Sequence, residues 1–336
     1  MRLIISLLLL TLLFSCNNNN KTPDVSAIKI DLNTHRFERD LFSLDTNKIA
    51  EHIDQLVEKY PSFGSFFIAT ILTADPRWPQ DSVNAYIRSF ISSYRPVYDS
   101  TEKVFADFTP YENEIKNGLQ YLQYYFPKYK APHNIITYIG PMDGYGDVIT
   151  DDALAVGLHV HLGKNYSAYK STWVQETYPE YVTNRFEPSY ISINCMKNIM
   201  NDMYPEKNED KTLIIQMVEK GKRLYLLSKL LPGKEEYKLI GYTAKQLKDC
   251  YANEGQIWDL FIQNNFLQTI DNNVIKNYVA EGPKTQELGD GSPGNIGSFA
   301  GWQIVKKYMD KNPKTTLDQL MNADAEIIFQ EARYKP

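Results

Sequence analysis

The second half of the chain is a succession of helix-like segments. From Thr177 onward, apolar residues recur every three or four positions, and prolines separate one such segment from the next. The segments predicted as helices are 189–203, 211–230, 244–266, 296–310 and 317–321. A half with this pattern leaves little room for a large sheet, so the strands must come from the first half.

The first half offers three short strand candidates. Alternation of apolar and polar residues favours a strand at 28–32, and apolar runs favour strands at 134–140 and 154–163. The stretch 141–152 between the last two carries the glycines and aspartates typical of a turn. The fold class we predict is α+β, with a small N-terminal and central sheet and a mostly helical C-terminal half in one domain, residues 28–336.

The N-terminus indicates a lipoprotein. Residues 3–14 form an apolar run too short to span a bilayer as a mature helix, and the L-F-S-C sequence that ends at Cys16 resembles a bacterial lipobox. That resemblance implies that residues 1–15 are a signal peptide and that Cys16 becomes the acylated, for example palmitoylated, first residue. Residues 16–27 would then be the anchor and tether. A plain signal peptide with an incidental cysteine is the alternative.

Charge and cysteine content exclude some functions. The formal net charge is −5 without a basic stripe, which argues against nucleic acid as a partner. Three cysteines occur, and apart from Cys16 they are Cys195 and Cys250, which could pair in an oxidising periplasm or stay as separate buried residues. Because no C-x-x-C motif occurs, a thiolate zinc site is not expected.

Residues 216–228, QMVEKGKRLYLLS, have the frame of a zinc-peptidase helix without its metal ligands. The motif H-E-x-x-H places two imidazoles one turn apart, with a glutamate as general base. On residues 218–222 the frame keeps Glu219, while Val218 and Lys222 stand at the two histidine positions. Val218 cannot coordinate a metal, and the ammonium of Lys222 would repel one.

The C-terminal half resembles a known family. Residues 253–262, NEGQIWDLFI, resemble the second helix of glutamate-type zincins, in which Glu254 falls on the third-ligand position. That run, together with GKRLYLLSKLLPG (221–233) and SPGNIGSFAGWQIVKKYM (292–309), resembles the gliding-motility lipoprotein GldB family of Bacteroidetes-type bacteria. IGYTAKQL, LGKNYSAY and the lipobox add to the match. The family is in turn similar to predicted zinc peptidases, so the resemblance implies a zincin-like fold.

The resemblance also implies a role. GldB-like proteins are membrane-anchored and periplasmic, are required for gliding and are linked to type IX secretion, with no defined biochemical activity. We therefore expect a pseudopeptidase without cofactor, and protein partners in the gliding and secretion apparatus. The lipid would hold it on the inner or the outer membrane, facing the periplasm.

The residues of the frame predict how such a site would be neutralised. We expect Lys222 to replace the metal cation and to pair with Glu219, Glu254 or both, because buried carboxylates are costly unless neutralised. The alternative is a solvated helix face with these charges in water.

Two histidines support the competing hypothesis of an active metal-dependent hydrolase. His159 and His161 lie at i and i+2 of the strand predicted at 154–163, so both would project from one face. Such a pair can bind zinc, with Asp147, Asp151 or Asp152 as a third ligand. Metal-free carboxylate chemistry by Glu219 and Glu254 is another route to activity. The plainer alternative is two histidines hydrogen-bonded to neighbours or open to solvent.

Glycines spaced four apart characterise the helix predicted at 296–310. Gly297 and Gly301 would share one face, where the absence of a side chain lets another helix approach closely. The glycine-rich stretch 289–297 lacks the lysine and the preceding strand of a phosphate-binding loop, so we predict a tight turn there.

Overall fold

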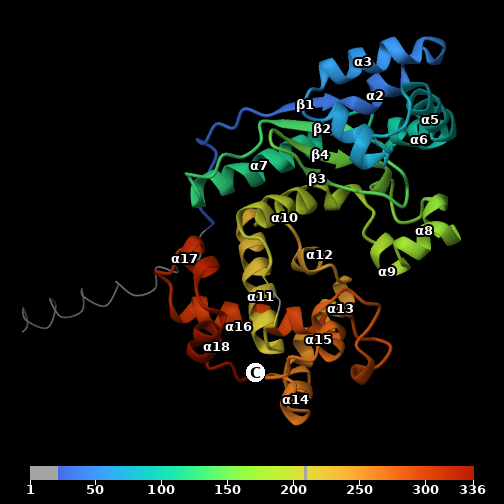
Figure 1. Cartoon of the computed structure of the whole chain (residues 1–336). Helices are drawn as coiled ribbons and strands as arrows, with labels where there is room; N and C mark the ends of the chain where they lie inside the picture. The colour runs from blue at the N-terminus through green and yellow to red at the C-terminus, as the bar shows by residue number, and fades with distance from the viewer. Residues whose placement is uncertain (1–21, 208–209) are drawn as a thin grey trace, which may run out of the picture.

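The structure of the protein, a computed structural model, describes residues 22–207 and 210–336 (Figure 1). The predicted signal peptide, the lipidation site Cys16 and the tether up to residue 21 lie outside these residues. Within them, no helix combines the length and the apolar character needed to cross a membrane.

A four-stranded mixed sheet forms in the first half of the chain (Figure 1). Its spatial order is β1 (Asn33–Arg36), β2 (Asn134–Tyr138), β4 (Ala153–Gly157) and β3 (Val148–Ile149). β1 and β4 run parallel to β2, and β3 runs antiparallel to β4. The two central strands are almost fully buried, as expected where both faces of a sheet are covered.

The sheet separates two apolar cores. Side chains of β2 alternate, so that Ile135 faces one core while Ile136 and Tyr138 face the other. The helices over the second core are α2 (Phe37–Phe42), α3 (Ile49–Lys59), α5 (Gln80–Ser93) and α6 (Arg95–Val104). The first core is covered by α7 (Thr109–Tyr125) and α10 (Ile191–Met203), and it continues into the C-terminal half.

The C-terminal half is built around two long helices, α11 (Leu213–Leu230) and α16 (Ile296–Lys311), which pack extensively against each other. Both are buried on most of their circumference, which is typical of a helix in the middle of a bundle. The shorter helices around them are α12 (Glu236–Ile240), α13 (Ala244–Ala252), α14 (Glu254–Gln263), α15 (Asn272–Val279), α17 (Leu317–Asn322) and α18 (Ala325–Ala332).

Glycines mark the point where α11 and α16 cross. A Cβ atom on Gly301 would overlap the carbonyl oxygen of Met217, and one on Gly221 would overlap the carbonyl oxygen of Gly301. A Cβ on Gly297 would lie 2.9 Å from the carbonyl oxygen of Tyr278. The close packing predicted from the spacing of Gly297 and Gly301 is confirmed.

One strand prediction was wrong and another extended too far. The segment 28–32 is not a strand, because the carbonyl of Ile28 accepts a hydrogen bond from the Gln120 side chain of α7, and pairing with β2 begins only at Asn33. The strand predicted at 154–163 stops at Gly157, where its pairing with β2 ends, and a 3-10 turn, Leu158–Val160, follows.

The helix predicted at 244–266 is two helices. Thr243 caps the start of α13 through reciprocal hydrogen bonds with Gln246, a capping box. Asn253 interrupts the run with φ −119° and ψ 24°, and its side chain donates to the Asp249 carbonyl at 2.8 Å. This local side-chain bond competes with continuation of the helix.

The two described cysteines do not form a disulfide in this structure. Cys195 in α10 and Cys250 in α13 are both free and buried. Burial raises the pKa of both thiols, that of Cys250 to about 12. They act as small apolar side chains, which was the second of the two alternatives.

Candidate functional site

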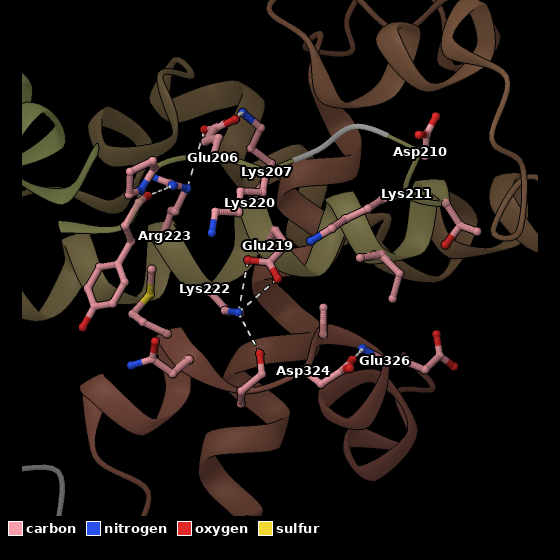
Figure 2. Close-up of a pocket in the computed structure, with 18 of the residues that line it drawn as sticks. Glu206, Lys207, Asp210, Lys211, Glu219, Lys220, Lys222, Arg223, Asp324 and Glu326 are labelled. Carbon is pink, nitrogen blue, oxygen red and sulfur yellow. Dashed lines mark hydrogen bonds and ion pairs between the residues drawn. The ribbon is translucent and has the colours of Figure 1, made fainter. Parts of the chain in front are cut away.

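A cavity of about 790 Å³ opens beside the first half of α11 (Figure 2). Its walls come from the segment that joins α10 to α11, from α11 itself and from the turn that leads into α18. Charged side chains of both signs line it, among them Lys207, Lys211, Glu219, Lys222 and Asp324. Glu219 and Lys222 of α11 therefore border a cavity large enough for a small ligand or a peptide segment.

Lys222 and Glu219 meet in this cavity. The Lys222 ammonium donates to Glu219 Oε1 at 3.1 Å and to the carbonyl oxygen of Ala323 at 2.9 Å (Figure 2). The Lys222 side chain is only 2 % exposed, against 26 % for Glu219. Burial lowers the pKa of Lys222, and the charge of Glu219 partly offsets this. The pairing of these two residues predicted from the sequence is confirmed.

The other two residues of the predicted site lie elsewhere. Val218 is fully buried in the core that α11 shares with α16 and does not line the cavity. Glu254, at the start of α14, accepts a hydrogen bond from the Tyr334 hydroxyl at 2.6 Å. Within the described part of the chain Glu254 makes no contact with Lys222, so only two of the four predicted residues come together.

A second group of charges borders the same cavity and was missed from the sequence. The Lys220 ammonium lies 2.9 Å from a Glu206 carboxylate oxygen, and Arg223 Nε lies 3.6 Å from the other. Arg223 also donates to Asn201 at 2.8 Å and to the Tyr204 carbonyl. Glu206 lies in the connection between α10 and α11, which has no periodic sequence pattern. Its ion pairs with Lys220 and Arg223 of α11 therefore could not be predicted from residue spacing.

His159 and His161 do not share one face of a strand, so that prediction was wrong. Both follow the end of β4, His159 within the 3-10 turn, and both are buried. His159 Nδ1 accepts a hydrogen bond from the Gly140 backbone N–H at 3.1 Å. Burial lowers the pKa of His159 to about 3.

His161 belongs to a different cluster, around Asp147. His161 Nε2 lies 2.8 Å from Asp147 Oδ2, and its Nδ1 lies 3.1 Å from the Glu187 carbonyl oxygen. Asn194 and the Gly157 backbone N–H also donate to the same carboxylate, at 2.7 and 3.1 Å. Asp151 and Asp152, the other candidate ligands, are exposed in the turn before β4. The plainer alternative, histidines hydrogen-bonded to their neighbours, describes this geometry.

No group of three or more His, Cys, Asp and Glu side chains gathers closely enough for a metal ion anywhere in residues 22–207 and 210–336. The cavity beside α11 instead offers paired ammonium and carboxylate groups in a partly enclosed space. Such an arrangement can form charge-assisted hydrogen bonds with a polar or charged ligand.

The Lys222–Glu219 pair gives a stability prediction. We expect Glu219→Ala to lower the free energy of unfolding by about 2 kcal/mol, because it leaves a buried ammonium with a single acceptor. Lys222→Met should cost less than about 1 kcal/mol, since it removes the buried charge. Urea unfolding at pH 7 measures both changes, and equal losses would contradict the pairing.

The pH dependence of the same pair has a defined sign. The pKa of Lys222 is lower in the folded than in the unfolded state. Just below pH 10.5 the unfolded chain therefore binds more protons, and the stability of the wild type rises with pH relative to Lys222→Met. The measurement is the difference in free energy of unfolding between the two proteins at pH 7 and at pH 10. The contribution of the tyrosines, which also titrate in this range, is common to both proteins and drops out of the difference.

Comparison with known proteins gives one match. A family model described as gliding motility protein GldB, whose label marks a lipoprotein family, matches residues 18–336. No curated protein and no solved structure matches the chain.

Proposed function

Because the chain belongs to the GldB family of gliding motility proteins, we propose that it is a non-catalytic binding component of the gliding machinery. In this proposal a lipid on Cys16 holds the domain on the cell membrane, facing the periplasm, and its partners belong to the gliding and type IX secretion apparatus. The cavity beside α11 receives a segment of one such partner.

The observation that carries the proposal is the buried Lys222 ammonium. It pairs with Glu219, the residue at the general-base position of the H-E-x-x-H frame, and so puts a positive charge beside that carboxylate without a metal ion. The ammonium lies 3.1 Å from the Glu219 carboxylate, on the side where a general base would have to contact a metal-bound water.

Descent from a zinc peptidase is a separate part of the proposal. Its support is Glu219 and Lys222 at the second and last positions of the H-E-x-x-H frame, on one helix and beside one cavity. Neither Val218 in the core nor Glu254 at Tyr334 adds to that support. The binding role stands without this ancestry, because it depends only on the cavity and its charges.

Substitutions in the native gene separate binding from catalysis. Glu219→Gln keeps an acceptor for Lys222. If the protein only binds, cells with this variant should glide as wild-type cells do. If it is a hydrolase that uses Glu219, these cells should not glide. Lys211→Glu reverses a charge on the cavity wall, and we expect it to reduce colony spreading several-fold without changing the amount of protein. Lys48→Glu, an exposed change away from the cavity, is the matched control.

Two further measurements bear on the proposal. Partners that co-purify with the wild type from solubilised membranes should be lost with Lys211→Glu and retained with Lys48→Glu. Stoichiometric zinc in native protein, or turnover of casein or a peptide library that Glu219→Gln abolishes, would overturn the non-catalytic role.

A further inference from the structure

A second cavity, of about 870 Å³, lies where the described chain begins. Thr22 and Pro23 form part of its wall. The rest comes from the end of α7, from the second half of α11 and the residues that follow it into α12, and from the end of α16 and its connection to α17. Figure 1 shows the start of the described chain beside the end of α7 and α17. The cavity therefore lies at the point where the domain meets the tether that leads back to Cys16.

Tyrosine and lysine side chains characterise this cavity. Tyr124 is 51 % exposed, and Tyr125 and Tyr225 are half-buried beside it. The Lys229 ammonium lies 4.9 Å from the centroid of the Tyr225 ring, and Lys314 is exposed in the part of the wall between α16 and α17. The ring and the lysine stem bury apolar surface while the hydroxyl and the ammonium stay polar, which suits a boundary between water and lipid.

Most of the remaining charges of the wall are engaged in ion pairs. Lys234 pairs with Glu114 at 2.6 Å, and Glu236 pairs with Lys306 at 2.7 Å. The charged groups that remain on the wall are two ammonium groups, of Lys229 and Lys314, and one carboxylate, of Asp310. The charge left for an incoming group is thus positive.

We propose that this cavity faces the membrane and receives the phosphodiester headgroups of its phospholipids. Lys229 and Lys314 would contact the phosphate, and Tyr124, Tyr125 and Tyr225 would lie at the level of the headgroups. The inference rests on the lipid anchor of the proposed function and adds to it an orientation of the domain. The binding cavity beside α11 would then be presented at a fixed height above the membrane.

The length of the tether makes this contact difficult to avoid. Five residues, 17–21, lie between Cys16 and Thr22, and the six Cα-to-Cα steps between them reach at most about 20 Å. The lipid anchor already holds the domain close to the phospholipids, so their effective concentration at the cavity is high. The contact therefore does not have to offset the entropy lost when a free protein binds a membrane. The attraction of two lysines to an anionic surface then has only to bias the orientation of a domain that is already anchored.

Fluorescence quenching of the full lipidated chain tests the orientation. Thr315→Cys on the cavity wall and Ser92→Cys on α5, at the other end of the molecule in Figure 1, are each labelled with a thiol-reactive fluorophore. The described native cysteines are buried, which favours labelling of the new site. In vesicles of phosphatidylethanolamine and phosphatidylglycerol with nitroxide-labelled headgroups, we expect at least threefold stronger quenching at Thr315→Cys.

Substitutions and flotation separate this inference from the anchor. Lys229→Gln combined with Lys314→Gln should reduce the quenching at Thr315→Cys at least twofold while the protein still floats with the vesicles. Flotation with equal quenching at both labels would overturn the inference alone. A wild-type chain that does not float would remove the anchor and this inference together. Protection of Thr315→Cys in native membranes, without quenching in protein-free vesicles, would show a protein partner on this face and would also overturn it.

Discussion

Gly301→Ala is expected to lower the free energy of unfolding by about 3 kcal/mol or more. The added Cβ would overlap the Met217 carbonyl oxygen in the neighbouring helix, and a backbone atom cannot rotate away as a side chain would. The helices α11 and α16 would have to separate at the centre of the C-terminal core, where both are buried. Urea unfolding followed by circular dichroism measures the loss.

A matched glycine controls for the effect of helix propensity. Gly255 lies in α14, and a Cβ placed there meets no other atom within 4 Å. Gly255→Ala should therefore leave stability unchanged or raise it by up to about 1 kcal/mol, because alanine favours the helix. Gly221→Ala, on the other side of the crossing, should behave like Gly301→Ala. Equal stability of Gly301→Ala and the wild type would mean that the two helices do not approach as described.

The close approach of these helices was predictable because its signal is local. Apolar periodicity locates α11 and α16 within two residues of their observed ends, and glycines four apart identify one face of α16. A helix makes its backbone hydrogen bonds within itself, so the residues of the helix largely determine where it begins and ends. The partner glycine, Gly221, follows only from the three-dimensional packing.

Strand limits were less predictable because they depend on distant residues. β4 ends where its pairing with β2 ends at Tyr138, although apolar residues continue to Leu162. Segment 28–32 alternates like a strand, yet Gln120 of α7 binds one of its carbonyls. In both cases the identity of the neighbour, absent from the local pattern, decides which backbone groups are paired.

In the candidate site, too, the local contact could be predicted from the sequence and the long-range contacts could not. Glu219 and Lys222 are three positions apart on one helix, so their pairing follows from helix geometry. The third partner, the Ala323 carbonyl, lies 101 positions further along the chain and could not be predicted. Glu254 was misjudged because a motif match fixes neither the direction of α14 nor the neighbour at Tyr334.

His159 is expected to make the folded protein acid-sensitive. Its side chain is fully buried, and Nδ1 needs its lone pair to accept the hydrogen bond from the Gly140 N–H. Burial lowers the pKa to about 3 from an ordinary value of 6.5. Between these values the unfolded chain binds one more proton than the folded chain, so stability is lost as the pH falls through this window.

The size of this loss follows from the linkage relation. One proton corresponds to about 1.4 kcal/mol per pH unit, or about 4 kcal/mol between pH 6.5 and pH 3.5. His159→Asn supplies a non-titrating oxygen near the Nδ1 position, so the difference between wild type and variant isolates His159 from other acid-sensitive groups. Chemical denaturation at half-unit pH steps should show the wild type losing stability relative to the variant. His133→Asn, at an exposed histidine, is the control for the histidine-to-asparagine change itself. Parallel profiles for wild type and His159→Asn would mean that His159 accepts a proton in the folded state, contrary to its enclosure beside Gly140.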